Sequence, residues 1–148
     1  MSSGTQELQG FWLFFPVVFI CLWLCVSFFI SRMGWHSFAT RYPARIRPGG
    51  TVYNSPASWF GIIFASYRNV IRVIFTDTGV YFYAMFLFRA FHPPFLVPWH
   101  SVKCVEKKKG LFGPRYRLDI KDAAGEIHVL LPEKVEHDLS RYCSHLNH

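Results

Sequence analysis

The sequence predicts an α+β protein. One N-terminal transmembrane helix and a short interfacial helix precede a bent sheet or barrel of about seven antiparallel strands, and an amphipathic helix ends the chain. Three observations predict this order: an uncharged run begins at residue 11, apolar and polar residues alternate after residue 51, and helical spacing returns after Pro132. We therefore divide the chain into a tail (1–10), a membrane helix (11–31), an interfacial helix with a basic linker (32–50) and a domain (51–148).

The run FWLFFPVVFICLWLCVSFFI, residues 11–30, contains no charged residue. A helix needs about 20 such residues, at ~1.5 Å each, to cross the hydrocarbon core of a bilayer. Its Phe, Val, Leu and Ile side chains favour insertion by on the order of 4 to 8 kcal/mol in total. A cleaved signal peptide would need a basic start and a shorter apolar core. The first ten residues contain no Lys or Arg, so the run is interpreted as a permanent anchor.

Basic residues follow the apolar run, and none precede it. Glu7 is the one charged residue before it, whereas four arginines come soon after it: Arg32, Arg41, Arg45 and Arg47. Positive charge close to a span stays on the cytoplasmic side, so we expect the N-terminus outside and the domain in the cytoplasm. The net charge of +7 suits a lipid bilayer with anionic headgroups as a partner. Nucleic acid is not an expected partner, because the basic residues are dispersed and accompany no binding motif.

Trp35, Phe38 and Tyr42 recur at helical spacing directly after the span and form the predicted interfacial anchor. Trp and Tyr rings favour the level of the lipid headgroups. We therefore expect a short helix that lies along the cytoplasmic surface of the bilayer. Pro43 ends this helix, and the segment ARIRPGG (44–50) has the composition of a linker.

Alternating or continuous apolar segments predict the strands of the domain, over residues 70–76, 80–88, 95–99, 102–108, 115–121 and 127–131. The turn Asp77-Thr78-Gly79 joins the first two as a hairpin. Val135, Leu139, Tyr142, Cys143 and Leu146 then recur at helical spacing. This amphipathic helix is expected to pack over one opening of the sheet.

Two segments carry a resemblance to a known fold. FTDTGVYF (75–82) and FLVPWHSVKCVE (95–106) look like strands and turns of pleckstrin-homology-like domains in their bacterial, GRAM-like versions. With the upstream anchor they also resemble a class of membrane-anchored bacterial proteins. The resemblance implies a binding or scaffolding module in a bacterial inner membrane, and it implies neither enzymatic activity nor a cofactor.

Two surfaces are candidate binding sites. The first is a candidate lipid-binding set of basic residues around an apolar turn, joined by two arginines near the first hairpin: Lys107, Lys108, Lys109, Phe112, Arg115, Arg117, Arg68 and Arg72. An ordinary solvated hairpin gives the same pattern, since charged strand edges also prevent aggregation. The second is a candidate partner-binding set: Tyr81, Tyr83, Met85, Leu87 and Trp99. A closed barrel with partly exposed aromatic side chains is the alternative interpretation of this set.

The sequence offers no candidate catalytic, cofactor-binding or metal-ligating residue. It contains no G-x-S-x-G, H-E-x-x-H or C-x-x-C motif and no glycine-rich phosphate loop. We therefore expect a non-enzymatic accessory or scaffold protein that binds a membrane-protein partner, or a second copy of itself, through its span and domain. A module that senses anionic lipid is the first alternative, and an unrecognised enzyme is the second.

Overall fold

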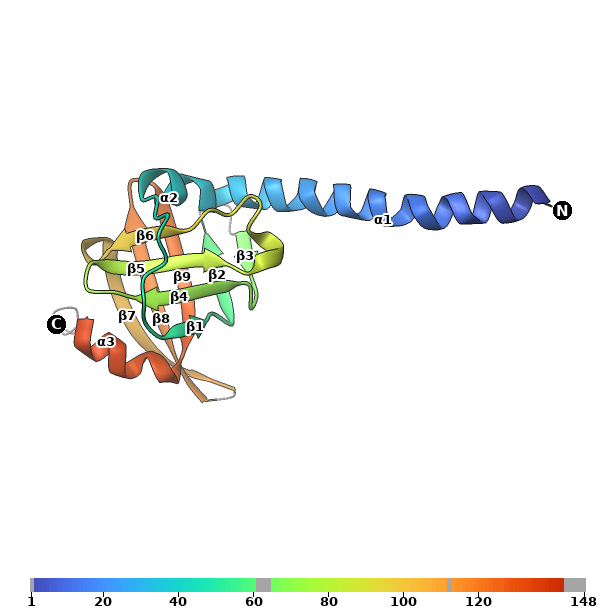
Figure 1. Cartoon of the computed structure of the whole chain (residues 1–148). Coiled ribbons are helices and arrows are strands. Elements are labelled where there is room, and N and C mark those ends of the chain that lie inside the picture. Colours follow the sequence, from blue (N-terminus) through green and yellow to red (C-terminus); the bar gives the residue numbers. More distant parts are fainter. Residues whose placement is uncertain (1, 61–64, 112, 143–148) are drawn as a thin grey trace.

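The computed structural model describes residues 2–60, 65–111 and 113–142 (Figure 1). Helix α1 (Ser2–Ile30) leads through η1 (Ser31–Trp35), a segment kinked at Gly34, into α2 (His36–Arg41). The strands are β1 (Val52–Asn54), β2 (Ala57–Phe60), β3 (Ala65–Tyr67), β4 (Ile71–Phe75), β5 (Gly79–Ala84), β6 (Phe95–Pro98), β7 (Val102–Gly110), β8 (Gly113–Asp122) and β9 (Gly125–Pro132). Three short 3₁₀ turns, η2 (Phe86–Phe88), η3 (Trp99–Ser101) and η4 (Glu133–Val135), and helix α3 (Glu136–Tyr142) complete the described chain. The predicted α+β class is confirmed.

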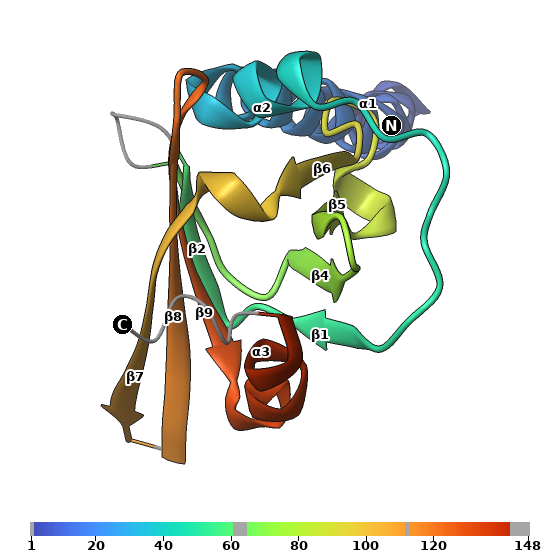
Figure 2. The same cartoon turned by 90° about the vertical axis from the view of Figure 1, so that its left-hand side faces the viewer.

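The strands form two antiparallel sheets, ordered β1-β4-β5-β6 and β3-β2-β9-β8-β7. The sheets face each other across the core, with α2 at one end and α3 at the other (Figures 1 and 2). Val73 and Phe82 from the first sheet and Leu118 and Val129 from the second are completely buried. The described strands form no closed barrel, and they number nine where the sequence predicts about seven. The additional strands lie before residue 68, where β1, β2 and β3 are too short for the sequence to show an alternating pattern.

Helix α1 runs directly into the domain. Trp35 and Phe38 lie in the core, and the Trp35 indole Nε1 donates a hydrogen bond to the Pro93 carbonyl at 2.8 Å. The ring centroids of Trp35 and Phe95 are 4.8 Å apart. The predicted headgroup-level position of Trp35 and Phe38 is therefore wrong, because α2 covers one end of the two sheets and its apolar stripe faces them. The packed domain begins near Ser31, and residues 51–148 alone lack part of its core. The predicted tail also continues the helix, since α1 begins at Ser2.

Tyr42, the third predicted anchor residue, fastens the end of α2 to strand β8. Its half-buried hydroxyl donates a hydrogen bond to the Asp122 carboxylate. Arg41 Nε lies 2.7 Å from Asp122 Oδ1, and Ser101 Oγ donates to Oδ2 at 2.7 Å. Burial by itself would raise the pKa of Asp122, but the hydrogen bonds from Tyr42 and Ser101 outweigh it and lower this pKa to about 2. The carboxylate therefore stays charged and holds three segments together.

The segment predicted to be a linker packs on the outer face of the four-stranded sheet. Residues 43–50 cross β5 and β4 on their way to β1 (Figure 1). A Cβ atom added to Gly50 would lie 3.2 Å from Ile74 Cγ2, and Ile74 is completely buried although it points away from the core. Tyr81 lies opposite Ile74 in the β4–β5 register, and only 3% of its surface is exposed. The expectation that Tyr81 is open to a partner is therefore corrected.

Candidate membrane-proximal site

The segment between β5 and β6 packs against the C-terminal part of α1. The Phe88 ring lies 4.9 Å from the Trp23 ring, and the Phe91 ring lies 5.4 Å from the Phe28 ring, measured between centroids. The predicted strand over residues 80–88 ends earlier, because the chain after Ala84 turns into η2. This segment and the end of α1 therefore form one packed junction.

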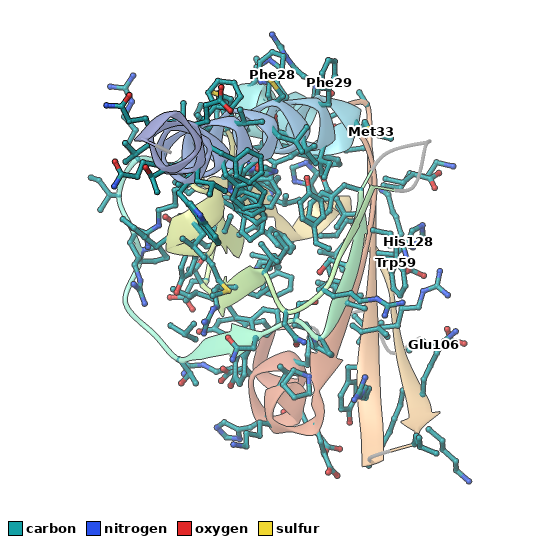
Figure 3. All side chains as sticks on the ribbon, turned by 90° about the vertical axis from the view of Figure 1, so that its right-hand side faces the viewer. Phe28, Phe29, Met33, Trp59, Glu106 and His128 are labelled. Carbon is teal, nitrogen blue, oxygen red and sulfur yellow. The ribbon has the colours of Figure 1, made fainter. Side chains whose placement is uncertain are left out.

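The junction presents apolar side chains to the outside. Phe86 is 81% exposed and Leu87 is 65% exposed, and both lie in η2. Figure 1 shows η2 on the side of the domain from which α1 extends. Phe29 near the end of α1 and Met33 in η1 are exposed and point away from the domain (Figure 3). Leu87 of the predicted partner-binding set is thus exposed next to Phe88, whose ring contacts α1.

The remaining members of the predicted partner-binding set are half-buried or packed within the domain. Tyr83 and Met85 are half-buried near the junction. Trp99 donates a hydrogen bond from Nε1 to the Thr76 carbonyl at 2.8 Å, and its ring stacks with Phe75 and Tyr142. The structure therefore keeps Leu87 exposed next to Phe88 and places Trp99 in a packed aromatic stack.

A buried histidine lies under the junction. His92 Nδ1 lies 2.8 Å from the Phe88 carbonyl oxygen, which can only accept, so this nitrogen carries the proton. His92 Nε2 then accepts a hydrogen bond from the Tyr67 hydroxyl at 3.0 Å. The same hydroxyl lies 3.3 Å from the Ile30 carbonyl oxygen, at the last residue of α1. Burial lowers the pKa of His92 and raises the pKa of Tyr67, so both side chains are neutral near pH 7.

This histidine predicts a pH dependence of stability. In the unfolded chain His92 takes up a proton near its ordinary pKa of 6.5, whereas the folded chain binds that proton only at lower pH. Its contribution to stability is therefore complete above pH 6.5 and is lost as the pH falls below that value. Unfolding midpoints of the full chain in detergent, measured from pH 7.5 to 5, are expected to fall more steeply than those of His92→Asn, whose amide can still donate to Phe88. Identical slopes would contradict this role.

An open cavity of about 520 Å³ adjoins the junction. Its charged lining residues are Arg45, Arg47 and Arg89, and the described residues that line it include no Asp or Glu. The guanidinium carbons of Arg47 and Arg89 lie 5.0 Å and 5.9 Å from the centroid of the Tyr83 ring. Within the described part of the chain, none of the three arginines forms an ion pair with a carboxylate. Basic side chains from two distant segments therefore meet around one cavity.

The predicted lipid-binding set is spread over other parts of the domain. The β7–β8 hairpin, which carries its lysines, points away from α1 and α2 (Figure 2). Lys107 lies 3.9 Å from Glu136, Lys108 lies 3.6 Å from Glu106, and Lys109 is exposed. Phe112 lies outside the described residues.

The arginines of the predicted lipid-binding set lie at separate places on the domain and contact different residues. Arg117 pairs with Asp119 at 2.8 Å. Arg115 and Asn69 line a cavity of about 370 Å³, and Arg68, next to Asn69, is exposed. Arg72 pairs with Tyr83 in the β4–β5 register. The structure therefore brings Arg115 close to the Arg68 turn but does not gather the set into one site.

A polar cluster occupies the outer face of the five-stranded sheet, where Figure 3 labels Trp59, Glu106 and His128. His128 Nδ1 lies 2.6 Å from Asp119 Oδ1. Burial by itself would raise the pKa of Asp119, but hydrogen bonds from His128 and Arg117 lower it. Among the residues that the structure describes, no three His, Cys, Asp or Glu side chains are grouped so that they could hold a metal ion. We interpret this cluster as a surface ion-pair network.

Comparisons with protein-family models, curated proteins and solved structures find no match. The resemblance to pleckstrin-homology-like domains therefore stays a prediction. Function is inferred below from the geometry of the chain itself.

Proposed function

We propose that this chain is a non-enzymatic accessory or scaffold protein of a bacterial inner membrane. In this proposal α1 spans the bilayer, the domain lies in the cytoplasm, and a membrane-protein partner binds along α1 and the adjoining η2. Helix α1 is long and apolar enough to cross a membrane. The cytoplasmic placement of the domain is supported by the four arginines that follow the span.

The observation that carries the proposal is the junction between α1 and the domain. A simple tether needs only an apolar helix and a flexible connection. Here Trp23 and Phe28 of the helix pack on Phe88 and Phe91 of the domain, so the two parts hold a fixed relative orientation. The exposed side chains of Phe86 and Leu87 directly precede Phe88, so apolar surface of the domain lies next to its contact with the helix. Apolar surface on the helix and on the domain, held in one orientation, suits recognition of another membrane protein.

Site-specific photo-crosslinking in intact cells tests this proposal. A crosslinker is placed in turn at exposed positions of α1, such as Leu13, Phe19 and Phe29, and at Leu87. We expect one protein to be captured from one face of α1 and also from Leu87. Capture of a second copy of this chain would identify a homo-oligomer. Capture of lipid alone at every position would contradict the scaffold proposal.

Replacing part of the span tests whether α1 binds a partner or serves only to tether the domain. Residues 11–22 are replaced by a Leu and Ala sequence of equal length, while residues 23–30, which include the helix side of the junction, are kept. We expect the crosslink from Leu87 to weaken strongly, because half of the proposed binding surface is gone. Full retention of that crosslink would show that the replaced segment acts only as an anchor.

Anionic-lipid sensing through the β7–β8 hairpin is a second candidate function. It is favoured by Leu111, which is 93% exposed at a tip that also carries Lys107, Lys108 and Lys109. An apolar tip among basic side chains suits an anionic membrane interface. A triple Lys→Glu variant of the hairpin is expected to weaken contact with anionic lipid, measured as lipid crosslinking from Leu111.

A further inference from the structure

We propose that the cavity lined by Arg45, Arg47 and Arg89 binds the phosphate group of an anionic membrane lipid. The site rests on the proposed function in one respect: α1 must lie in a bilayer, so that the cavity is at the depth of the headgroups. It does not require a protein partner.

The charges around the cavity define the chemistry of its ligand. Arg47 and Arg89 approach the same aromatic ring, that of Tyr83, and no carboxylate among the described lining residues neutralises them. Positive charges gathered in this way repel one another, and the ring offsets only part of that repulsion. The planar guanidinium group of arginine forms paired hydrogen bonds with phosphate oxygens. An anion with several oxygen atoms is therefore the complementary ligand.

The size and the remaining lining residues suit more than a bare ion. About 520 Å³ falls within the range of small-molecule sites, roughly 300 to 1,000 Å³, and leaves room for a headgroup beside the phosphate. Tyr81 and Tyr83 also line the cavity. Burial raises the pKa of Tyr81 although Arg47 and Arg89 oppose this shift, so its hydroxyl stays neutral. The site thus combines three cations with the neutral phenol group of Tyr81 and the ring of Tyr83.

The position of the cavity identifies the source of the phosphate. Arg89 directly follows η2, between Phe88 on Trp23 and Phe91 on Phe28. Both helix residues belong to the second half of the uncharged run, so Arg89 is held beside the half of that run that adjoins the domain. The backbone of η2, which carries the exposed residues Phe86 and Leu87, lies on the side of the domain from which α1 extends (Figure 1). A phosphate at this depth belongs to a lipid of the leaflet on the side of the domain.

Native mass spectrometry of the full chain in detergent tests the proposal. Phosphatidylglycerol, phosphatidylcholine and inorganic phosphate are the three probes. We expect the protein to retain one phosphatidylglycerol at concentrations where phosphatidylcholine does not bind. The double variant Arg47→Gln/Arg89→Gln should lower the affinity for phosphatidylglycerol by at least about tenfold, the effect of one lost charge-assisted hydrogen bond.

The matched control removes the same charge from the hairpin. Lys107→Gln/Lys109→Gln also loses two positive charges, and we expect it to bind phosphatidylglycerol as the unaltered chain does. A greater loss in this control than in the arginine variant would move the lipid site to the hairpin and overturn the proposal.

Two further outcomes would overturn the proposal without any variant. Equal binding of phosphatidylglycerol and phosphatidylcholine by the unaltered chain would exclude a site for anionic lipid. Displacement of phosphatidylglycerol by inorganic phosphate at comparable concentration would make the ligand a free anion. Photo-crosslinking to a protein partner is a separate readout, so failure of the lipid site is distinguishable from failure of the scaffold proposal.

Discussion

Trp35→Ala is expected to lower the free energy of unfolding of the domain by about 3 to 5 kcal/mol, the usual range for a large buried aromatic side chain. Trp35 is completely buried, and its ring lies 5.2 Å from Phe60 and 4.8 Å from Phe95 between centroids. Its removal leaves a cavity and also leaves the Pro93 carbonyl without its indole donor. Denaturant unfolding of the full chain in detergent, followed by the circular dichroism of the sheets, measures the loss.

Two variants make this result specific. Trp12→Ala removes a Trp that is 70% exposed on α1, and we expect a change within about 0.5 kcal/mol. Trp35→Phe keeps most of the ring and loses the indole donor, so an intermediate loss is expected. An unchanged unfolding midpoint for Trp35→Ala would place this ring at the membrane interface, as the sequence pattern predicts, and would contradict its place in the core.

Gly79→Ala is expected to destabilise the domain by about 3 kcal/mol through a clash with a neighbouring strand. Gly79 begins β5 and pairs with Pro98 of β6. A Cβ atom at this position would lie 2.1 Å from the Val97 carbonyl oxygen and 2.9 Å from the Pro98 Cα atom. These are backbone atoms, so β6 must shift before the methyl group fits. The same unfolding measurement in detergent reports the loss.

Gly49→Ala is the matched control for this substitution. No atom lies within 4 Å of a Cβ built on Gly49, in the stretch that crosses the four-stranded sheet. We therefore expect its unfolding midpoint to equal that of the unaltered chain. If Gly79→Ala were equally neutral, β5 and β6 could not approach each other as closely as the structure shows.

The long elements of the fold were predictable because each carries a strong local signal. The uncharged run became α1, and the turn at Asp77-Thr78-Gly79 joins β4 to β5 as expected. The segments around residues 102–131 became the long strands β7 to β9, and the helical spacing after Pro132 became α3. Strands β1 to β3 contain three or four residues each, so their pattern is too short to show a period.

The candidate site could not be predicted in the same way. The stripe of Trp35 and Phe38 shows that one helix face is apolar, but the same stripe suits a membrane surface and a protein core. Arg45 and Arg47 lie in a stretch with the composition of a linker, and Arg89 lies more than forty residues later in a turn. Only the packing of residues 43–50 across β5 brings them to one cavity. Spatial convergence of this kind leaves no periodic trace in the sequence.

The packed junction also has a mechanical consequence. A transmembrane helix changes its tilt to match its hydrophobic length to the thickness of the bilayer. Because Trp23 and Phe28 already pack on Phe88 and Phe91 of the domain within the apolar run, a change of helix tilt is passed on to the domain. With α1 in a bilayer, the helix and the domain therefore change their orientation together. A thicker membrane would bring α1 upright and rotate the domain against the membrane plane, which converts bilayer thickness into domain orientation.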